Sequence, residues 1–265
     1  MTAILMTPGD MLLAGGMIFG SIILSLVFSL GIQKALFIAA LRMVVQLVLA
    51  GSVLLLIFGR SSVWLTIAML VFMFAAASYE VGTRQLVRLT PDWHFGIGGG
   101  STIIGTVIVV LLGLLTALQP HPWYQARTAI PMTGLLLGNV MNAVSLTMNT
   151  LLSTISRERS AIEARLTLGA TRTEAMNVSI RQAIRAALIP TLNQMAAAGI
   201  ITLPGIMTGQ ILAGMNPMEA SKYQIVLMSL IVSGNMIGAT LAAVLTAVRL
   251  SDSRGRLRLD RLFRK

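Results

Sequence analysis

The sequence is poor in the residues that hold metals and catalyse reactions. It contains no cysteine and only two histidines, His94 and His121, in 265 residues. A disulfide framework, an iron–sulfur cluster and a thiolate metal site are therefore excluded, and two histidines are too few for the usual zinc sites. Its three lysines, Lys34, Lys222 and Lys265, do not follow the Gly-x-x-x-x-Gly pattern of a Walker A motif. We therefore expect no ATPase site or other catalytic motif, and no cofactor bound by this chain.

Charge is also scarce. Charged residues make up 11% of the chain, whereas a soluble domain carries about a quarter. Hydrophobic residues make up 55%, and with a mean hydropathy of +0.83 this apolar surplus could not be buried in a water-soluble globule. The net charge of +11 then favours a membrane face rich in anionic lipid. Nucleic acid is a poor second, because Phe263 is the only aromatic residue among the arginines of the C-terminal tail.

Seven stretches approach the roughly 20 apolar residues that a membrane-crossing helix needs. They are residues 11–30, 37–58, 63–79, 97–118, 130–152, 186–203 and 225–248. The sequence thus predicts an all-α polytopic membrane protein with about seven transmembrane helices, built as a single transmembrane domain over residues 1–265. The apolar stretch 206–213 is too short to cross, and is either a half-helix that re-enters the protein or a surface loop.

The basic residues predict the orientation of these spans. With the N-terminus outside, the outer loops hold only Arg60, Arg127 and Lys222, and Arg42 lies within the second span. All other Lys and Arg fall inside, which is a strong positive-inside bias. We therefore expect a multi-pass protein of the cell inner (cytoplasmic) membrane with a cytoplasmic C-terminus. The basic tail, about 249–265, is predicted to be a solvated anchor to anionic lipid.

The longest inner segment, about 153–185, carries the signals of two helix starts. Ser160 with Glu163, and Thr171 with Glu174, each have the pattern of a capping box, and Gly169 can end the first helix. That short helix is either an amphipathic helix resting on lipid or a coupling helix that fits a groove on a nucleotide-binding subunit. The residues expected to contact that subunit are Glu158, Glu163, Ala164, Leu168 and Gly169.

Short segments spread over the chain occur together in the order and spacing of one known family. They are 42–47 (RMVVQL), 130–132 with 138–139, 168–171 (LGAT), 185–190 (RAALIP) and 203–209 (LPGIMTG), which continues to 213–214 and 222–225. On these segments the chain resembles the FetB-type permease family of iron-export ABC transporters, most densely from 130 to 225. The resemblance implies a permease that dimerises, binds a separate ATP-hydrolysing subunit and moves its substrate outward. Members have been linked to bacterial iron efflux, and plant relatives to aluminium tolerance.

Polar residues inside spans are expensive, so they gather at pathways or at helix interfaces. At 100° per residue the fifth span carries one such stripe, and the sequence leaves both roles open for it. The stripe consists of Gly138, Asn142, Ser145, Asn149 and Ser153, with Asn139 at its margin. Most of the seventeen methionines are expected to pack the membrane core, although Met141 and Met207 lie beside polar elements. The predicted substrate-pathway residues are Asn139, Met141, Asn149, Gln194, Met207, Gln46 and Glu80.

Prolines predict where the sixth span bends and breaks. Pro190 removes a helical hydrogen bond, which makes it a candidate hinge. The break at Pro204 and Gly205 frees backbone groups that must be buried in protein or line a water-filled cavity. Broken helices of this kind often flank binding sites in transporters.

Together these observations predict the membrane-spanning subunit of an ABC transporter that exports a metal ion such as iron. The expected partners are a cognate ATP-binding subunit that carries the ATP, a second copy of the chain and membrane lipid, but no nucleic acid. One alternative is a permease of the same type that moves a lipid or a nucleotide sugar. Another is a non-transporting membrane anchor that transmits ATPase motion, although the short outer loops disfavour it. An ion-driven secondary transporter would need buried carboxylates in the spans, where Glu80 alone lies at a margin.

Overall fold

The structure is a computed structural model. It describes residues 7–60, 62–85, 87–90, 92–118, 122, 124–252 and 256–264. Helices dominate this part of the chain: α1 (Pro8–Val27), α2 (Gln33–Arg60), α3 (Val63–Thr83), α4 (Trp93–Leu112), α5 (Ala126–Arg157), α6 (Arg159–Thr167), α7 (Arg172–Ala197), α8 (Gly205–Leu212) and α9 (Pro217–Arg249). A π-helical segment, η1 (Gly113–Leu118), extends α4. A short strand, β1 (Val87–Leu89), follows α3, and a 3₁₀ turn, η2 (Leu259–Arg261), leads into a second strand, β2 (Leu262–Arg264). His121, Arg254 and Lys265 lie outside the described residues.

The chain divides into two compact units, residues 1–62 and 63–265. The first is the hairpin of α1 and α2, which pack against each other. Its first helix begins with a capping box, in which the Thr7 hydroxyl accepts from the backbone N–H of Asp10 while the Asp10 carboxylate accepts from that of Thr7. The turn between the two helices uses left-handed backbone at Ser29 and Gly31.

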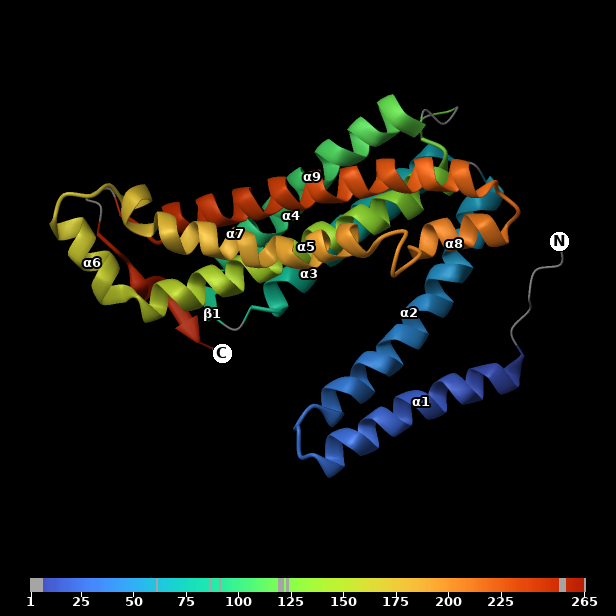
Figure 1. The fold of residues 1–265 in the computed structure, drawn as a ribbon, viewed down its shortest axis with the longest axis horizontal. Helices are drawn as coiled ribbons and strands as arrows, with labels where there is room; N and C mark the ends of the chain where they lie inside the picture. The colour runs from blue at the N-terminus through green and yellow to red at the C-terminus, as the bar shows by residue number, and fades with distance from the viewer. Residues whose placement is uncertain are drawn as a thin grey trace. The chain divides into compact units, whose positions relative to one another are not determined.

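The second unit is a bundle of long helices with α5 at its centre (Figure 1). α5 packs against α3, α4, α7 and α9, and α9 also packs against α4, α7 and α8. α4 and α9 approach closely at Gly105, where an added Cβ would lie 3.1 Å from the Cα of Gly238. Buried aliphatic side chains of α5, α7 and α9 form the larger core, with Met148, Leu151 and Ile155 fully enclosed.

Six described helices are long and apolar enough to cross a membrane: α1, α2, α3, α4, α5 and α9. They coincide with six of the predicted spans. The seventh, predicted at 186–203, is placed differently, because α7 begins at Arg172, ends at Ala197 and is followed by irregular backbone up to Gly205. Arg172, Arg181 and Arg185 make the first half of α7 too polar for a hydropathy scan to find. α7 nonetheless packs along α5 and α9, while the number of crossings and their orientation stay predictions.

The prediction of a solvated C-terminal tail is wrong for the residues that the structure describes. β2 pairs antiparallel with β1, in the register Val87 with Arg264 and Leu89 with Leu262. Leu257, Leu259 and Leu262 pack against the buried core, which explains why the tail folds back instead of extending into water. β1 and the tail lie at the same end of the bundle as α6 (Figure 1).

Candidate functional site

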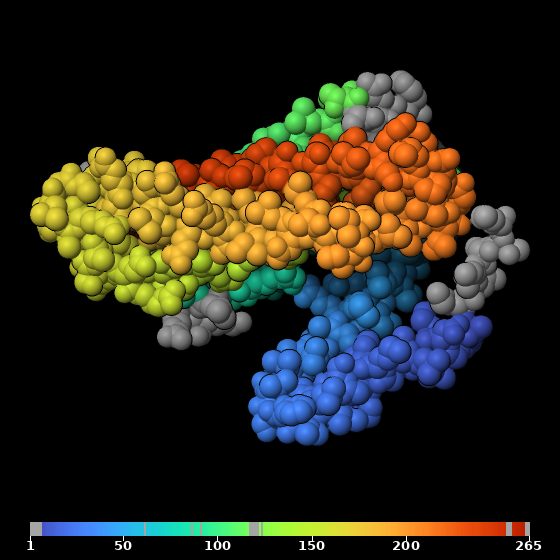
Figure 2. All heavy atoms as spheres, viewed as in Figure 1, coloured from blue at the N-terminus to red at the C-terminus, as the bar shows by residue number. Residues whose placement is uncertain are grey.

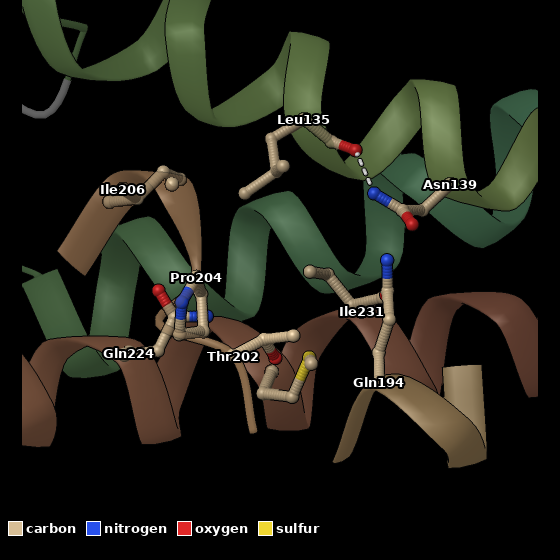
Figure 3. A pocket seen from close by; sticks show the side chains of 10 residues that line it. Leu135, Asn139, Gln194, Thr202, Pro204, Ile206, Gln224 and Ile231 are labelled. Carbon is tan, nitrogen blue, oxygen red and sulfur yellow. Dashed lines mark hydrogen bonds between the residues drawn. The ribbon is translucent and has the colours of Figure 1, made fainter. Parts of the chain in front are cut away.

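A cavity of about 350 Å³ opens where the chain is broken between α7 and α8. We call it the α8 cavity. It is lined by Leu135, Asn139, Gln194, Thr202, Pro204, Gly205, Ile206, Gln224, Met228 and Ile231. These residues come from α5, α7, α8, α9 and the connection before α8, so five segments of the chain converge on the space (Figure 3). The structure thereby brings together four residues that the sequence singled out, Asn139, Gln194, Pro204 and Gly205.

Carboxamides dominate the polar lining of the α8 cavity. The Asn139 amide donates to the carbonyl of Leu135 at 2.8 Å, which leaves its side-chain oxygen for a ligand. The Gln194 carboxamide extends toward that of Asn139 (Figure 3). The side-chain oxygen of Gln224 is buried and has no hydrogen-bond partner. Since a buried acceptor without a donor costs about 1–3 kcal/mol, the cavity is suited to a ligand that brings donors or positive charge.

The break itself is stabilised by local hydrogen bonds. α7 ends at Ala197, and the backbone N–H of Thr202 donates to the Ala197 carbonyl at 3.1 Å. Gly199 adopts a left-handed φ of +82°, and its N–H donates to the Thr202 carbonyl at 2.9 Å. Pro204 then precedes the first turn of α8. The short stretch 206–213 is therefore largely helical, as α8, rather than a surface loop, and its re-entry into the protein stays a prediction.

The polar stripe of α5 serves two purposes. Arg84 at the end of α3 pairs with Glu80 at 3.2 Å and donates to the Asn142 side-chain oxygen at 2.9 Å. Asn149 donates to the Arg84 carbonyl at 3.5 Å. Asn142 and Asn149 therefore hold α3 against α5, whereas Asn139 faces the α8 cavity.

A second, larger cavity of about 770 Å³ lies toward the C-terminal end of α5. We call it the tail cavity. It is lined by Val87, Asn149, Thr150, Ser153, Ser156, Arg157, Leu259 and Leu262. The C-terminal tail and β1 form one of its walls, and hydroxyl groups of α5 form the other.

The two cavities open on the same face of α5. At 100° per residue, Leu135 and Asn139 of the α8 cavity lie on the same side of the helix as Asn149 and Ser153 of the tail cavity. Ten residues separate Asn139 from Asn149, or about 15 Å along the helix. On this face Asn142 lies between them and is exposed. Polar side chains on one side of α5 thus extend along the helix from the α8 cavity to the tail cavity.

The short helix α6 forms a foot, residues 158–170, at the end of the α5–α7 pair (Figure 2). Ile162 anchors it in the core with 1% of its surface exposed, while Leu168 at its tip is 88% exposed. Gly169, with a φ of +93°, ends the helix in a Schellman motif, because Ala170 N–H donates to the Arg165 carbonyl and Gly169 N–H to that of Leu166. The predicted helix end is confirmed.

Only one of the two predicted capping boxes forms. At the start of α7 the Thr171 hydroxyl accepts from the Glu174 N–H, and these hydrogen bonds lower the pKa of Glu174. Ser160 does not cap α6, which begins at Arg159 after Glu158. Glu163 instead pairs with Arg159 at 2.9 Å. The reciprocal pattern at 160–163 was therefore a wrong prediction, because the preceding helix already continues to Arg157 and leaves Ser160 inside the next one.

Of the predicted subunit contacts, Ala164 and Gly169 are exposed near Leu168, Glu163 is half-buried, and Glu158 is turned inward. The Glu158 carboxylate accepts a hydrogen bond from the Ser179 hydroxyl of α7 at 3.2 Å. The exposed tip of the foot is thus small and apolar.

Other predicted pathway residues lie elsewhere. Met141 packs against the buried core, and Met207 is half-buried on α8 without lining the α8 cavity. Gln46 is exposed on α2, in the first unit. Pro190 lies inside α7 and is exposed, and its role as a hinge stays a prediction.

Among the α8-cavity residues whose side chains carry oxygen or sulfur, the sequence analysis missed Thr202, Gln224 and Met228. Gln224 lies in the segment 222–225, which already stood out as part of the family resemblance, so a signal was available. Among the described residues no group of three or more His, Asp or Glu side chains could hold a metal ion. In the α8 cavity, the described side chains able to contact a cation carry amide and hydroxyl oxygens and the thioether of Met228.

The sequence pattern of one protein family, described as "Uncharacterised protein family (UPF0014)", matches residues 8–250 of this chain. The chain belongs to the UPF0014 family. Its relatives include "UPF0014 membrane protein slr1647" of Synechocystis, 38% identical over 78% of this chain and 79% of the relative. The "Probable iron export permease protein FetB" of Escherichia coli is 30% identical over 98% of both chains. The Arabidopsis thaliana "Protein ALUMINUM SENSITIVE 3" is 33% identical over 87% of this chain and 80% of the relative.

These similarities confirm the resemblance to FetB-type permeases. No solved structure matches the chain significantly. With its long apolar helices and relatives named as membrane proteins, this UPF0014 member is a multi-pass membrane protein.

Proposed function

We propose that the chain is the membrane-spanning subunit of an ABC transporter that exports a metal ion such as iron. A separate ATPase subunit, which carries the ATP, grips the foot on the cytoplasmic side of the inner membrane. Two copies of the chain and two ATPases form the complete transporter. The relative named as a probable iron export permease supports this proposal along nearly the whole chain.

The observation that carries the proposal is the construction of the foot. Its buried side is fixed to the bundle through Ile162, and its exposed tip offers Leu168 beside Ala164. A rigidly attached helix with an apolar tip can transmit a push from a partner, because its core contacts resist displacement. An amphipathic helix that merely rests on lipid would need a broad apolar face directed outward, whereas Ile162 faces the core.

The α8 cavity is the candidate site for the cargo. Its oxygens and the thioether of Met228 are neutral ligands, so a cation would be held weakly and could be released. The break beside the cavity joins it to α7, which leads directly from the foot. Motion of the foot can therefore reach the cavity along one helix.

A second candidate is a permease of the same type that moves a non-metal substrate such as a lipid or a nucleotide sugar. The lining of the α8 cavity favours it, because carboxamides and a hydroxyl recognise polar organic groups as readily as cations. Among the described residues, no His, Asp or Glu side chain lines this cavity to select a transition metal.

The test is ATP-driven uptake into inside-out vesicles that contain the full chain with its co-purified ATPase subunit. We expect iron uptake that needs ATP hydrolysis and stops with a hydrolysis-deficient ATPase. A failure to take up iron, copper, manganese or zinc would favour the non-metal candidate. Transport that follows a proton gradient and ignores ATP would contradict the proposed function.

A further inference from the structure

Three arginines gather where β1, the C-terminal tail and the ends of α4 and α9 meet. Arg249 ends α9, and its guanidinium lies over the Trp93 ring of α4, 4.4 Å from the ring centroid. Arg261 of η2 donates to the Arg249 carbonyl at 2.6 Å. The Arg261 carbonyl in turn accepts from the backbone N–H of Thr90 at 2.8 Å. Arg88 lies opposite Phe263 in the β1–β2 pair, and Phe263 is two residues from Arg261 along the chain. We call Arg88, Arg249 and Arg261 the arginine cluster.

No salt bridge joins the cluster to a carboxylate among the described residues, although Arg261 adds a weak electrostatic attraction to Asp260. The two tail carboxylates pair with other arginines: Asp252 with Arg256 at 2.9 Å, and Asp260 with Arg258 at 2.8 Å. The bonds from Arg258 lower the pKa of Asp260 to about 2, so this pair is fully charged at neutral pH. No ion pair joins Arg88, Arg249 or Arg261 to a described carboxylate.

Two guanidinium groups of the cluster also contain buried donors without acceptors. The Nε atoms of Arg88 and Arg249 are both enclosed and donate no hydrogen bond. Buried donors are normally paired, and a charged one is especially costly to leave unpaired. The geometry of a guanidinium matches a phosphate group, which can accept two parallel bonds.

The surroundings of the cluster indicate the source of the phosphate. Trp93 is 47% exposed and lies at the start of α4. Farther along the same face of this helix, Ile104, Ile108 and Leu111 are also exposed. This apolar face is the one that suits lipid tails. A tryptophan at its end is typical of the membrane–water boundary, where headgroups lie.

We propose that the arginine cluster binds the phosphate of an anionic phospholipid headgroup, with Trp93 packed beside the upper acyl chains. Basic pockets between helix ends are a recurrent way to hold such headgroups. The lipid also ties β1 to the tail that closes the tail cavity. The site is independent of the transported substrate, so the inference stands even if the cargo is not a metal.

The test uses the full chain purified in uncharged detergent, and follows Trp93 fluorescence after Trp64→Phe and Trp123→Phe. Brominated phosphatidylglycerol is expected to quench this fluorescence at lower concentration than brominated phosphatidylcholine. Unlabelled phosphatidylglycerol should relieve the quenching. Equal quenching by both lipids would overturn the proposal. Relief by millimolar inorganic phosphate alone would show a free-phosphate site, and would overturn the assignment to lipid.

Substitutions then separate the cluster from general tail charge. Arg88→Gln and Arg249→Gln are each expected to weaken phosphatidylglycerol binding about fivefold, and about 25-fold together. The matched control is Arg256→Gln with Arg258→Gln, which removes the same charge from arginines that already have partners. Equal weakening by the control would overturn the proposal. The wild-type quenching experiment remains decisive if a cluster variant fails to fold.

Discussion

Leu168 at the tip of the foot provides the sharpest mutational test of ATPase coupling. We compare Leu168→Ala with Ile162→Ala, two truncations on the same short helix. Leu168 is almost fully exposed and Ile162 almost fully buried. Leu168→Ala should therefore weaken binding to a partner without lowering the stability of the chain, whereas Ile162→Ala should lower the stability.

The expected magnitudes follow from these exposures. Burying Leu168 in a partner groove contributes about 0.8 kcal/mol for each carbon that truncation removes, about 2.4 kcal/mol in all, which weakens binding about 50-fold. The stability of the isolated chain should change by less than about 0.5 kcal/mol. Ile162→Ala should instead cost about 2–5 kcal/mol of stability, because it leaves a cavity in the core.

The assay is a titration of the purified ATPase subunit onto the detergent-solubilised chain, with thermal unfolding of each variant measured in parallel. Leu212→Ala on α8 is the control, since Leu212 is also exposed but lies away from the foot. Wild-type ATPase affinity for Leu168→Ala would refute the assignment of the foot as the coupling element. So would an equal loss of affinity for Leu212→Ala.

Three further predictions concern packing, the α8 cavity and the start of α7. Gly105→Ala should lower stability by about 1–3 kcal/mol, since its Cβ meets backbone of α9, whereas Gly100→Ala, with open space around it, should unfold like the wild type. Gln224→Met should keep or raise the melting temperature, because it removes an unpaired buried oxygen, yet it should reduce ATP-driven flux. Unchanged flux would show that Gln224 is not part of the substrate pathway. The Glu174 carboxylate, whose pKa is lowered, stabilises the start of α7 at pH values above 4.5, its ordinary pKa. This contribution is lost as the pH falls through the lowered pKa. The hydrogen-exchange protection factor of that turn, measured relative to a Thr171→Ala variant, should therefore be unchanged from pH 6 to 8 and fall only in acid.

Hydropathy predicted the long helices well because the bilayer demands apolar length, but it predicted their ends poorly. α5 extends to Arg157, and α9 starts at Pro217, well outside the apolar stretches. Outside the hydrocarbon layer a helix can continue with polar side chains, so hydropathy carries no information about its end. Local capping signals succeeded at Thr171 and Gly169, where backbone geometry alone decides.

The site was predicted in part. Asn139, Gln194 and Pro204 were found from the cost of polar groups and the effect of proline on a helix, and both are local properties of the sequence. Gln224 and the folded tail were missed, because each depends on contacts between segments distant in sequence. The alternation of Leu257 and Leu259 was the one local sign that the tail would pack.

The account depends on the foot facing the compartment that contains the ATPase. Because the chain has no cysteine, Ala164→Cys introduces a single label site on the exposed side of α6. A membrane-impermeant maleimide should label it in inside-out vesicles and not in intact cells or right-side-out vesicles. Labelling from the outside would contradict the account.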